Sequence, residues 1–270
     1  MSWGGLKKSF NRAGTQLMQR TGQLERSDDT RFKEEEAKYR EFEKHATTLL
    51  KYSRDYLDAI RLMSASEARI GDTIEGFYHD NSQTASIASS YKRALEELDA
   101  RTAKELDGPY RATVLDPMSK LCSYFPEVNK LIEKRGRKLL DYDASRSRYK
   151  KQSERPGDDP SKLPRYVSIT DNSMERENNE AKLVFDAIDE QLMTELPQLV
   201  DMRVPYLDPS LEMMIRIQIK FAQEGYEQLG GVQRYFPEQV RNDYADGQLD
   251  AQVEGVLQEM RGLSICGLGQ

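Results

Sequence analysis

The sequence predicts an all-α fold built from three long, kinked helices preceded by an amphipathic segment. Charged residues make up 32% and hydrophobic residues 37% of the 270 positions, a balance typical of long helices and coiled coils rather than of a round domain. Apolar residues recur with helical spacing along most of the chain, with no strand pattern between them. Prolines and glycines interrupt this pattern at a few places and divide it into separate tracts.

The first helical tract is expected from about Thr30 to His79. Apolar residues occupy two positions of a heptad repeat, which indicates coiled-coil packing. One position holds Phe32, Tyr39, Ala46, Ser53, Ile60, Glu67 and Ile74, and the other holds Glu35, Phe42, Leu49, Tyr56, Met63, Ile70 and Phe77. At a rise of 1.5 Å per residue, a helix of about 50 residues spans roughly 75 Å, which is long for a compact domain.

A short polar linker at 79–88 separates this tract from the second, which is expected from about Ile87 to Gln152. Internal prolines remove backbone hydrogen bonds and kink helices, so the second tract should be bent, or broken near Pro109. Its three prolines are Pro109, Pro117 and Pro126. An exposed loop rich in proline is expected at 151–167.

The third tract is expected from about Ile169 to Tyr244 and should bend near its middle. The prolines there are Pro197, Pro205 and Pro209. Gly247 ends the tract, and apolar spacing at 249–263 predicts a last short amphipathic helix followed by a flexible tail.

The first 26 residues are the most informative segment. On a helical wheel their apolar residues share one narrow face, formed by Trp3, Leu6, Phe10, Ala13 and Leu17. The basic residues Lys7, Lys8, Arg12 and Arg20 flank or oppose that face. Such a helix is typical of a membrane interface, and its glycines make it weak, so we expect it to be disordered in water and to fold on a surface. The alternative is an N-terminal helix that docks on its own domain.

A second basic segment lies at 130–155, with ten basic and four acidic residues, in a chain whose formal net charge is −6. Lys130, Lys134, Arg137 and Lys138 recur at helical spacing, and Arg148, Lys150 and Lys151 continue the charge towards the loop. Arg135 and Arg146 interrupt the apolar face; we count them with the membrane-binding residues, with ion pairs to a neighbouring helix as the alternative. A charge run is more commonly a solvated face, but two basic segments on an acidic chain favour an anionic partner.

The sequence carries no recognisable catalytic or cofactor motif. His45 and His79 lie far apart, and there is no P-loop, no dinucleotide-binding fingerprint and no CxxC pair. We therefore expect no enzyme activity, no cofactor and no metal. Cys122 and Cys266 give no disulfide framework, which fits a reducing cytosol.

The anionic partner is expected to be a membrane surface rather than nucleic acid. No motif for binding nucleic acid accompanies the basic segments, and few aromatic residues are available for base stacking. No apolar run reaches the ~18 residues of a spanning helix, so the membrane contact should be peripheral. A structural coiled-coil scaffold that links actin and endocytic proteins without touching lipid is the alternative.

Specific blocks of sequence resemble a known family. These are MSWGGLKKSFNRAG at 1–14, ELPQLVDMRVPYLDPS at 195–210 and IQIKFAQEGYEQL at 217–229. Together with the three kinked tracts and the basic segments, they make the chain similar to N-BAR domain proteins. The resemblance is greatest to the fungal amphiphysin-like proteins of the "reduced viability upon starvation" type, in their short form without an SH3 domain, and it spans essentially the whole chain.

This resemblance implies a crescent-shaped antiparallel dimer with a coiled-coil core that senses or induces curvature of anionic phospholipid membranes. It implies a partner that is a second copy or a longer SH3-containing BAR relative, with endocytic proteins of actin patches contacted indirectly. The expected location is cytoplasmic, at cortical actin patches of the plasma membrane. The domains are a membrane-binding segment at 1–26, the BAR domain at 27–246, and a C-terminal helix and tail at 247–270. Dimerisation also follows from the apolar stripes, which a three-helix monomer leaves uncovered.

Overall fold

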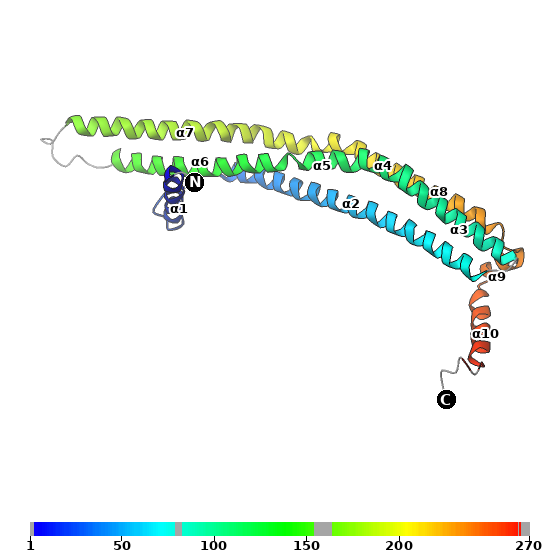
Figure 1. The fold of residues 1–270 in the computed structure, drawn as a ribbon. Coiled ribbons are helices and arrows are strands. Elements are labelled where there is room, and N and C mark those ends of the chain that lie inside the picture. The colour runs from blue at the N-terminus through cyan, green and yellow to red at the C-terminus, as the bar shows by residue number, and fades with distance from the viewer. Residues whose placement is uncertain (1–2, 79–82, 154–163, 264, 266–270) are drawn as a thin grey trace. The chain divides into compact units, whose positions relative to one another are not determined.

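The computed structural model describes residues 3–78, 83–153, 164–263 and 265 of the chain. All regular elements within these ranges are helical, which confirms the predicted all-α class (Figure 1). In chain order they are α1 (Trp3–Arg20), α2 (Thr30–Phe77), α3 (Gln83–Arg101), η1 (Thr102–Leu106), α4 (Asp107–Tyr110), η2 (Arg111–Leu115), α5 (Asp116–Cys122), α6 (Phe125–Ser153), α7 (Pro164–Asp201), α8 (Arg203–Gln233), α9 (Glu238–Ala245) and α10 (Leu249–Arg261).

The first predicted tract is one unbroken helix, α2, as the heptad pattern indicates. Two residues before its first residue, the carboxylate of Asp28 accepts hydrogen bonds from the backbone N–H of Thr30 at 3.1 Å and from its hydroxyl at 2.8 Å. These bonds hold the pKa of Asp28 below its ordinary value. The polar linker is shorter than predicted, because α3 already begins at Gln83; residues 79–82 lie outside the described part of the chain.

The second tract is widened rather than broken at Pro109. The π-helical turns η1 and η2 stand on either side of α4, which contains this proline. A π turn accommodates a residue that cannot donate a backbone hydrogen bond. The interruption occurs instead at Ser123 and Tyr124, and Pro126 then lies in the first turn of α6, where proline is tolerated.

The third tract consists of α7 and α8, interrupted at Met202. Pro197 lies inside α7, and Pro209 inside α8. The tract ends at Gln233, earlier than predicted, and α9 follows. The predicted loop at 151–167 is shorter, because α6 extends to Ser153 and α7 begins at Pro164; the residues between them are not described.

The end of the chain agrees with the prediction. The helix α10 covers Leu249–Arg261, and Gly247 before it has a φ of +70°, a left-handed conformation that glycine adopts without strain. The tail at 266–270 lies beyond the described residues.

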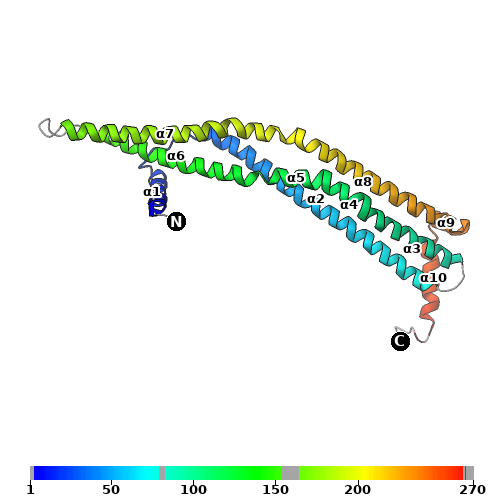
Figure 2. The ribbon, with the colours of Figure 1, turned by 45° about the horizontal axis from the view of Figure 1, so that its top comes forward.

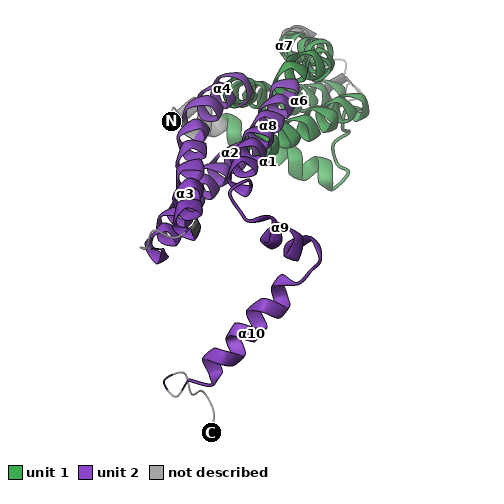
Figure 3. Cartoon of the chain, turned by 90° about the vertical axis from the view of Figure 1, so that its right-hand side faces the viewer, with its two compact units in different colours: residues 1–52, 115–210 green, residues 53–114, 211–270 purple. Residues whose placement is uncertain are grey.

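The chain divides into two compact units, coloured separately in Figure 3. Unit 1 contains residues 1–52 and 115–210, and unit 2 contains residues 53–114 and 211–270. The helix α2 contributes its first part to unit 1 and the rest to unit 2. In unit 1, α6 and α7 run side by side (Figure 2).

The core of unit 1 is formed by α2, α5, α6 and α7. The ring of Phe125 packs edge-on against Tyr39 and Phe42, with centroid distances of 6.1 and 5.5 Å. Leu192 and Leu196 of α7 complete the same buried cluster. The apolar residues of α2 are therefore covered by neighbouring helices at this end of the helix.

Only one of the two heptad positions of α2 is buried along most of its length. The first position is buried from Phe32 to Ile60, including Ser53. At the second position, burial is lost beyond Phe42, where the side chains are exposed or half-buried: Leu49, Tyr56, Met63, Ile70 and Phe77. A single chain leaves this face of α2 uncovered.

Candidate membrane-binding surface

The N-terminal helix α1 docks on α6 within unit 1 (Figures 1 and 2). Arg12 donates two hydrogen bonds to the carboxylate of Asp141, from Nε at 2.8 Å and from Nη2 at 2.7 Å, and they raise the pKa of its guanidinium. Gln19 donates to the carboxylate of Asp143 at 2.8 Å. Thr15, which is only 5% exposed, lies between them on the same face. The surface of α1 that contacts α6 is therefore its polar one.

The apolar residues of α1 lie on the opposite side, in solvent. Phe10 is 83% exposed and Leu17 is 64% exposed. At about 100° per residue, these positions lie roughly 180° around the helix from the docked face. Trp3, Leu6 and Lys7 belong to α1 by their backbone, but their side chains lie outside the described residues.

In the structure this segment is a helix docked on its own domain, which is the alternative interpretation of the sequence. Polar contacts with α6 hold the helix in place. The docking differs from the usual kind, because it leaves the apolar side chains of Phe10 and Leu17 uncovered.

Exposed bases of α6 share a helical face with Asp141, one of the residues that hold the docked helix. Lys130, Lys134, Arg137 and Arg148, which we call the basic stripe, fall on one helical face with Asp141. Asp141 interrupts the positive charge of this face, and Arg12 pairs with it. One part of α1 is therefore held at the edge of this face, through Arg12 and Asp141.

The bases of the stripe make only exposed ion pairs. Lys130 lies 2.6 Å from Glu127 on the preceding turn, and Arg148 lies 3.0 Å from Glu177 of α7. Such pairs are worth about 0–1 kcal/mol in water and leave the cations accessible. Outside the basic stripe, the predicted bases that are exposed are Lys8, Lys150 and Lys151.

Three further predicted bases are half-buried and form ion pairs with acids inside unit 1. They are Arg12, Lys138 and Arg146. Lys138 lies 3.8 Å from Asp141. Arg146 lies 3.4 Å from Asp143 and donates to the hydroxyl of Ser27 at 3.1 Å. We expect them to contribute less to an external surface than the basic stripe.

Arg135 is not part of any external surface, so its assignment to the membrane-binding residues is wrong. Its side chain is only 4% exposed. It donates to Asp29 at 2.6 Å and to Asp189 of α7 at 2.7 Å, and its guanidinium lies 3.5 Å from the ring centroid of Phe32. The alternative, an ion pair with acids of neighbouring elements, is confirmed. This residue is buried because it joins α6 to α7 and to the start of α2.

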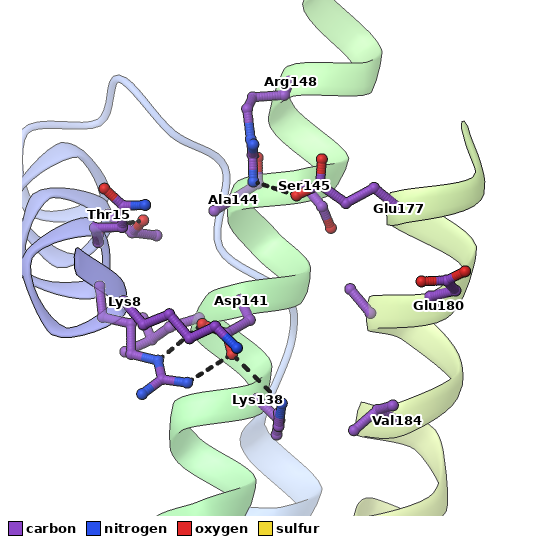
Figure 4. A pocket seen from close by; sticks show the side chains of 14 residues that line it. Lys8, Thr15, Lys138, Asp141, Ala144, Ser145, Arg148, Glu177, Glu180 and Val184 are labelled. Carbon is purple, nitrogen blue, oxygen red and sulfur yellow. Dashed lines mark hydrogen bonds and ion pairs between the residues drawn. The ribbon is translucent and has the colours of Figure 1, made fainter. Parts of the chain in front are cut away.

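A pocket of about 370 Å³ opens between α1, α6 and α7 (Figure 4). Lys8 of α1 and Lys138 and Arg148 of α6 line it together with the acids Asp141 and Glu177. No cluster of three or more metal-ligating side chains is present in the described part of the chain. Among the described helices, none is both long and apolar enough to cross a membrane.

The docking contacts of α1 were missed at the level of sequence. They involve Gln19, Ser27, Asp141 and Asp143. One signal was present: Arg12, Thr15 and Gln19 recur at helical spacing opposite the apolar face. Their partners could not be identified, because Arg12 and Asp141 are 129 residues apart in the chain.

Comparison with known proteins decides the family. The model of the BAR domain family matches residues 6–237. The chain belongs to the BAR domain family. Members of this family remodel membranes and are not enzymes, so membership confirms the predicted class of function.

The chain is similar to several fungal proteins over its full length. It is 50% identical to "Protein hob3" of Schizosaccharomyces pombe, over 99% of this chain and 98% of that protein. It is 38% identical to "Reduced viability upon starvation protein 161" of Saccharomyces cerevisiae, over 100% of this chain and 99% of that protein. It is also 38% identical to "Regulator of cytoskeleton and endocytosis RVS161" of Candida albicans, over 100% of both chains. These relatives confirm the predicted fungal subgroup.

A solved structure shares the fold. The amphiphysin BAR domain from Drosophila superposes with a TM-score of 0.55 at 19% identity, covering 83% of this chain and 97% of that chain. At this identity the likeness concerns the fold alone, and it agrees with the predicted long, kinked helices of a BAR domain.

Proposed function

We propose that this BAR domain chain binds anionic membranes peripherally and senses or induces their curvature. The observation that carries the proposal is the polar docking of α1 beside the basic stripe, with Phe10 and Leu17 directed outward. Insertion of apolar side chains and attraction to anionic lipid then act at one surface. An inserted apolar side chain contributes about 1.5–3 kcal/mol before ordering costs, and a base near an anionic leaflet about 1 kcal/mol.

The functional unit is a dimer, formed with a second copy or with a longer SH3-containing BAR relative. Two exposed apolar stripes in unit 2 support this proposal. One lies on α2 and includes Ile70 and Phe77, and the other lies on α8 and includes Ile215 and Ile219. A stable interface of obligate type buries more than about 2,000 Å², which stripes of this length can supply.

In the cell, we place this activity in endocytosis and cortical actin organisation, on the cytoplasmic side of the plasma membrane at actin patches. The support is the full-length similarity to the Candida albicans protein named as a regulator of cytoskeleton and endocytosis. Endocytic proteins are contacted indirectly, through the dimer partner. The proposed division of labour keeps residues 1–26 as the membrane-binding segment, 27–246 as the BAR domain and 247–270 as a separate helix and tail.

Vesicle co-sedimentation tests the proposal. The chain should bind vesicles rich in phosphatidylserine, bind less as salt rises, and ignore phosphatidylcholine vesicles, because surface charges are screened within about 8 Å at physiological salt. Changing Lys130, Lys134 and Arg137 together to Glu should abolish binding. The matched control changes Arg234, Arg241 and Arg261 to Glu; these bases are also exposed but lie outside the basic stripe, so binding should weaken only slightly.

Two outcomes would contradict the proposal. One is an equal loss of binding in the stripe variant and its control, which would mean that net charge alone matters. The other is no binding by the intact chain, either alone or with a longer BAR relative. The second outcome would favour the structural scaffold without lipid contact.

A further inference from the structure

The docked helix α1 turns its polar face to the domain and its apolar face to solvent, the reverse of the usual arrangement. An amphipathic helix normally buries its apolar stripe against the domain and exposes its polar face. Here the polar residues Arg12, Thr15 and Gln19 face α6, while Phe10 and Leu17 face solvent. Something on α6 must therefore select the polar face of α1.

Two carboxylates on α6 account for this selection. Asp141 takes both hydrogen bonds of the Arg12 fork in a half-buried site. Asp143 is only 1% exposed, and a buried carboxylate needs hydrogen-bond donors. If α1 rotated to bury its apolar stripe, the two carboxylates would lose their hydrogen bonds from Arg12 and Gln19. Phe10 would then pack against charged groups.

Asp143 also fixes the segment that follows α1. It accepts a hydrogen bond from the hydroxyl of Ser27 at 2.6 Å, in addition to the one from Gln19. Leu24, in the same segment, is buried. Both ends of the connection between α1 and α2 are thereby held to α6.

We propose that Asp141 and Asp143 are positioning residues that hold α1 on α6 through its polar face, so that its apolar stripe is kept outward. This inference rests on the proposed function, since the helix thus positioned is the one that enters the membrane. In this arrangement Arg12 is a docking residue rather than a lipid contact. The helix is then already formed before it contacts the membrane, so binding loses less conformational entropy.

Hydrogen exchange of the full chain without lipid tests the docking itself. The helix α1 is short and contains glycines, so protection of its backbone amides depends on docking. Arg12→Asp and Asp141→Arg should each speed exchange across 8–20 by about tenfold or more, because each leaves a like-charge pair. The double variant restores the pair with reversed charges and should recover most of the protection.

The control is Arg20→Asp, which makes the same change of charge on an exposed residue of the same helix and should leave exchange unchanged. Exchange in α6 and α7 reports whether each variant is folded. The docking proposal is overturned if the single variants exchange like the unaltered chain, or if the double variant shows no recovery.

A second measurement separates the positioning role from the proposed function. Arg12→Gln combined with Asp141→Asn removes the pair without changing net charge, and this variant should bind phosphatidylserine vesicles several-fold more weakly. Unchanged binding of this variant would overturn the positioning role and leave the proposed function standing. No binding by the unaltered chain would overturn the proposed function and with it the positioning role, while exchange would still report the docking.

Discussion

Arg135 illustrates how one side chain can have opposite roles in a sequence pattern and in a folded chain. In sequence it belongs to a basic run, but in the structure it is buried between Asp29 and Asp189. Its partners could not be identified from the sequence, because they lie more than fifty residues away. Sequence could predict only that Arg135 interrupts an apolar face.

Replacing Arg135 by Ala should destabilise the chain by about 3–5 kcal/mol, because it leaves two acids without their cation in a buried site. The loss is measured by urea denaturation followed by circular dichroism. Arg137→Ala, on the exposed side of the same helix, should change stability by less than about 0.5 kcal/mol. Equal effects of the two substitutions would contradict the role given to Arg135.

The buried phenol of Tyr39 should make the folded chain less stable at alkaline pH. Burial raises the pKa of its phenol above the ordinary value, and its hydroxyl donates to Asn129 at 3.1 Å. The folded chain therefore keeps this proton at pH values where the unfolded chain loses it. The resulting stability is fully present below about pH 10 and is lost as pH rises further.

The urea midpoint should therefore fall above pH 10, and it should fall less steeply in Tyr39→Phe. Tyr226→Phe is the control, because it makes the same substitution at a tyrosine that is 83% exposed. Parallel declines in Tyr39→Phe and the unaltered chain would show that Tyr39 is not responsible.

At the scale of elements, sequence predicted the helices better than their interruptions. The heptad pattern gave the ends of α2 within a few residues, since a long periodic signal tolerates local exceptions. Proline positions were less informative, because the effect of a proline depends on its place in the helix: Pro126 is accommodated in a first turn and Pro109 between π turns. The docked face of α1 depends on long-range pairs, which no local pattern contains.

The contact between α2 and α3 gives a prediction at this scale. A Cβ added at Gly71 would lie 2.9 Å from the backbone Cα of Lys92, too close for α3 to stay in place. Gly71→Ala should therefore destabilise unit 2 by about 1–3 kcal/mol in thermal denaturation. Gly76→Ala in the same helix meets nothing within 4 Å and should be neutral or stabilising by up to about 1 kcal/mol. A stable Gly71→Ala variant would mean that the two helices are not closely packed.

For the whole molecule, the exposed apolar stripes of α2 and α8 predict self-association. Ile219→Asp should shift the chain from dimer to monomer at micromolar concentration in sedimentation equilibrium, because a buried unpaired carboxylate is costly. Leu183→Asp changes another exposed aliphatic residue, in unit 1, and should leave the dimer intact. Dissociation by both substitutions, or by neither, would contradict the assignment of the interface.

The candidate surface was partly predictable for a physical reason. The spacing of residues within one helix is enough to predict a basic face or an apolar stripe. Lys130, Lys134 and Arg137, like Phe10 and Leu17, could therefore be found from the sequence alone. Which bases form ion pairs inside the unit depends on the tertiary fold. The sequence could therefore not establish that Arg12, Arg135 and Arg146 form such pairs.

We propose that the N-terminal helix enters an anionic membrane through its apolar stripe. Trp3, the single tryptophan of the chain, is expected on that stripe and provides an intrinsic probe. Its fluorescence should be quenched by acyl chains brominated near the headgroup in phosphatidylserine vesicles, and should be unaffected by the same lipids in phosphatidylcholine vesicles. Unquenched Trp3 in chains that are bound to anionic vesicles would contradict the claim.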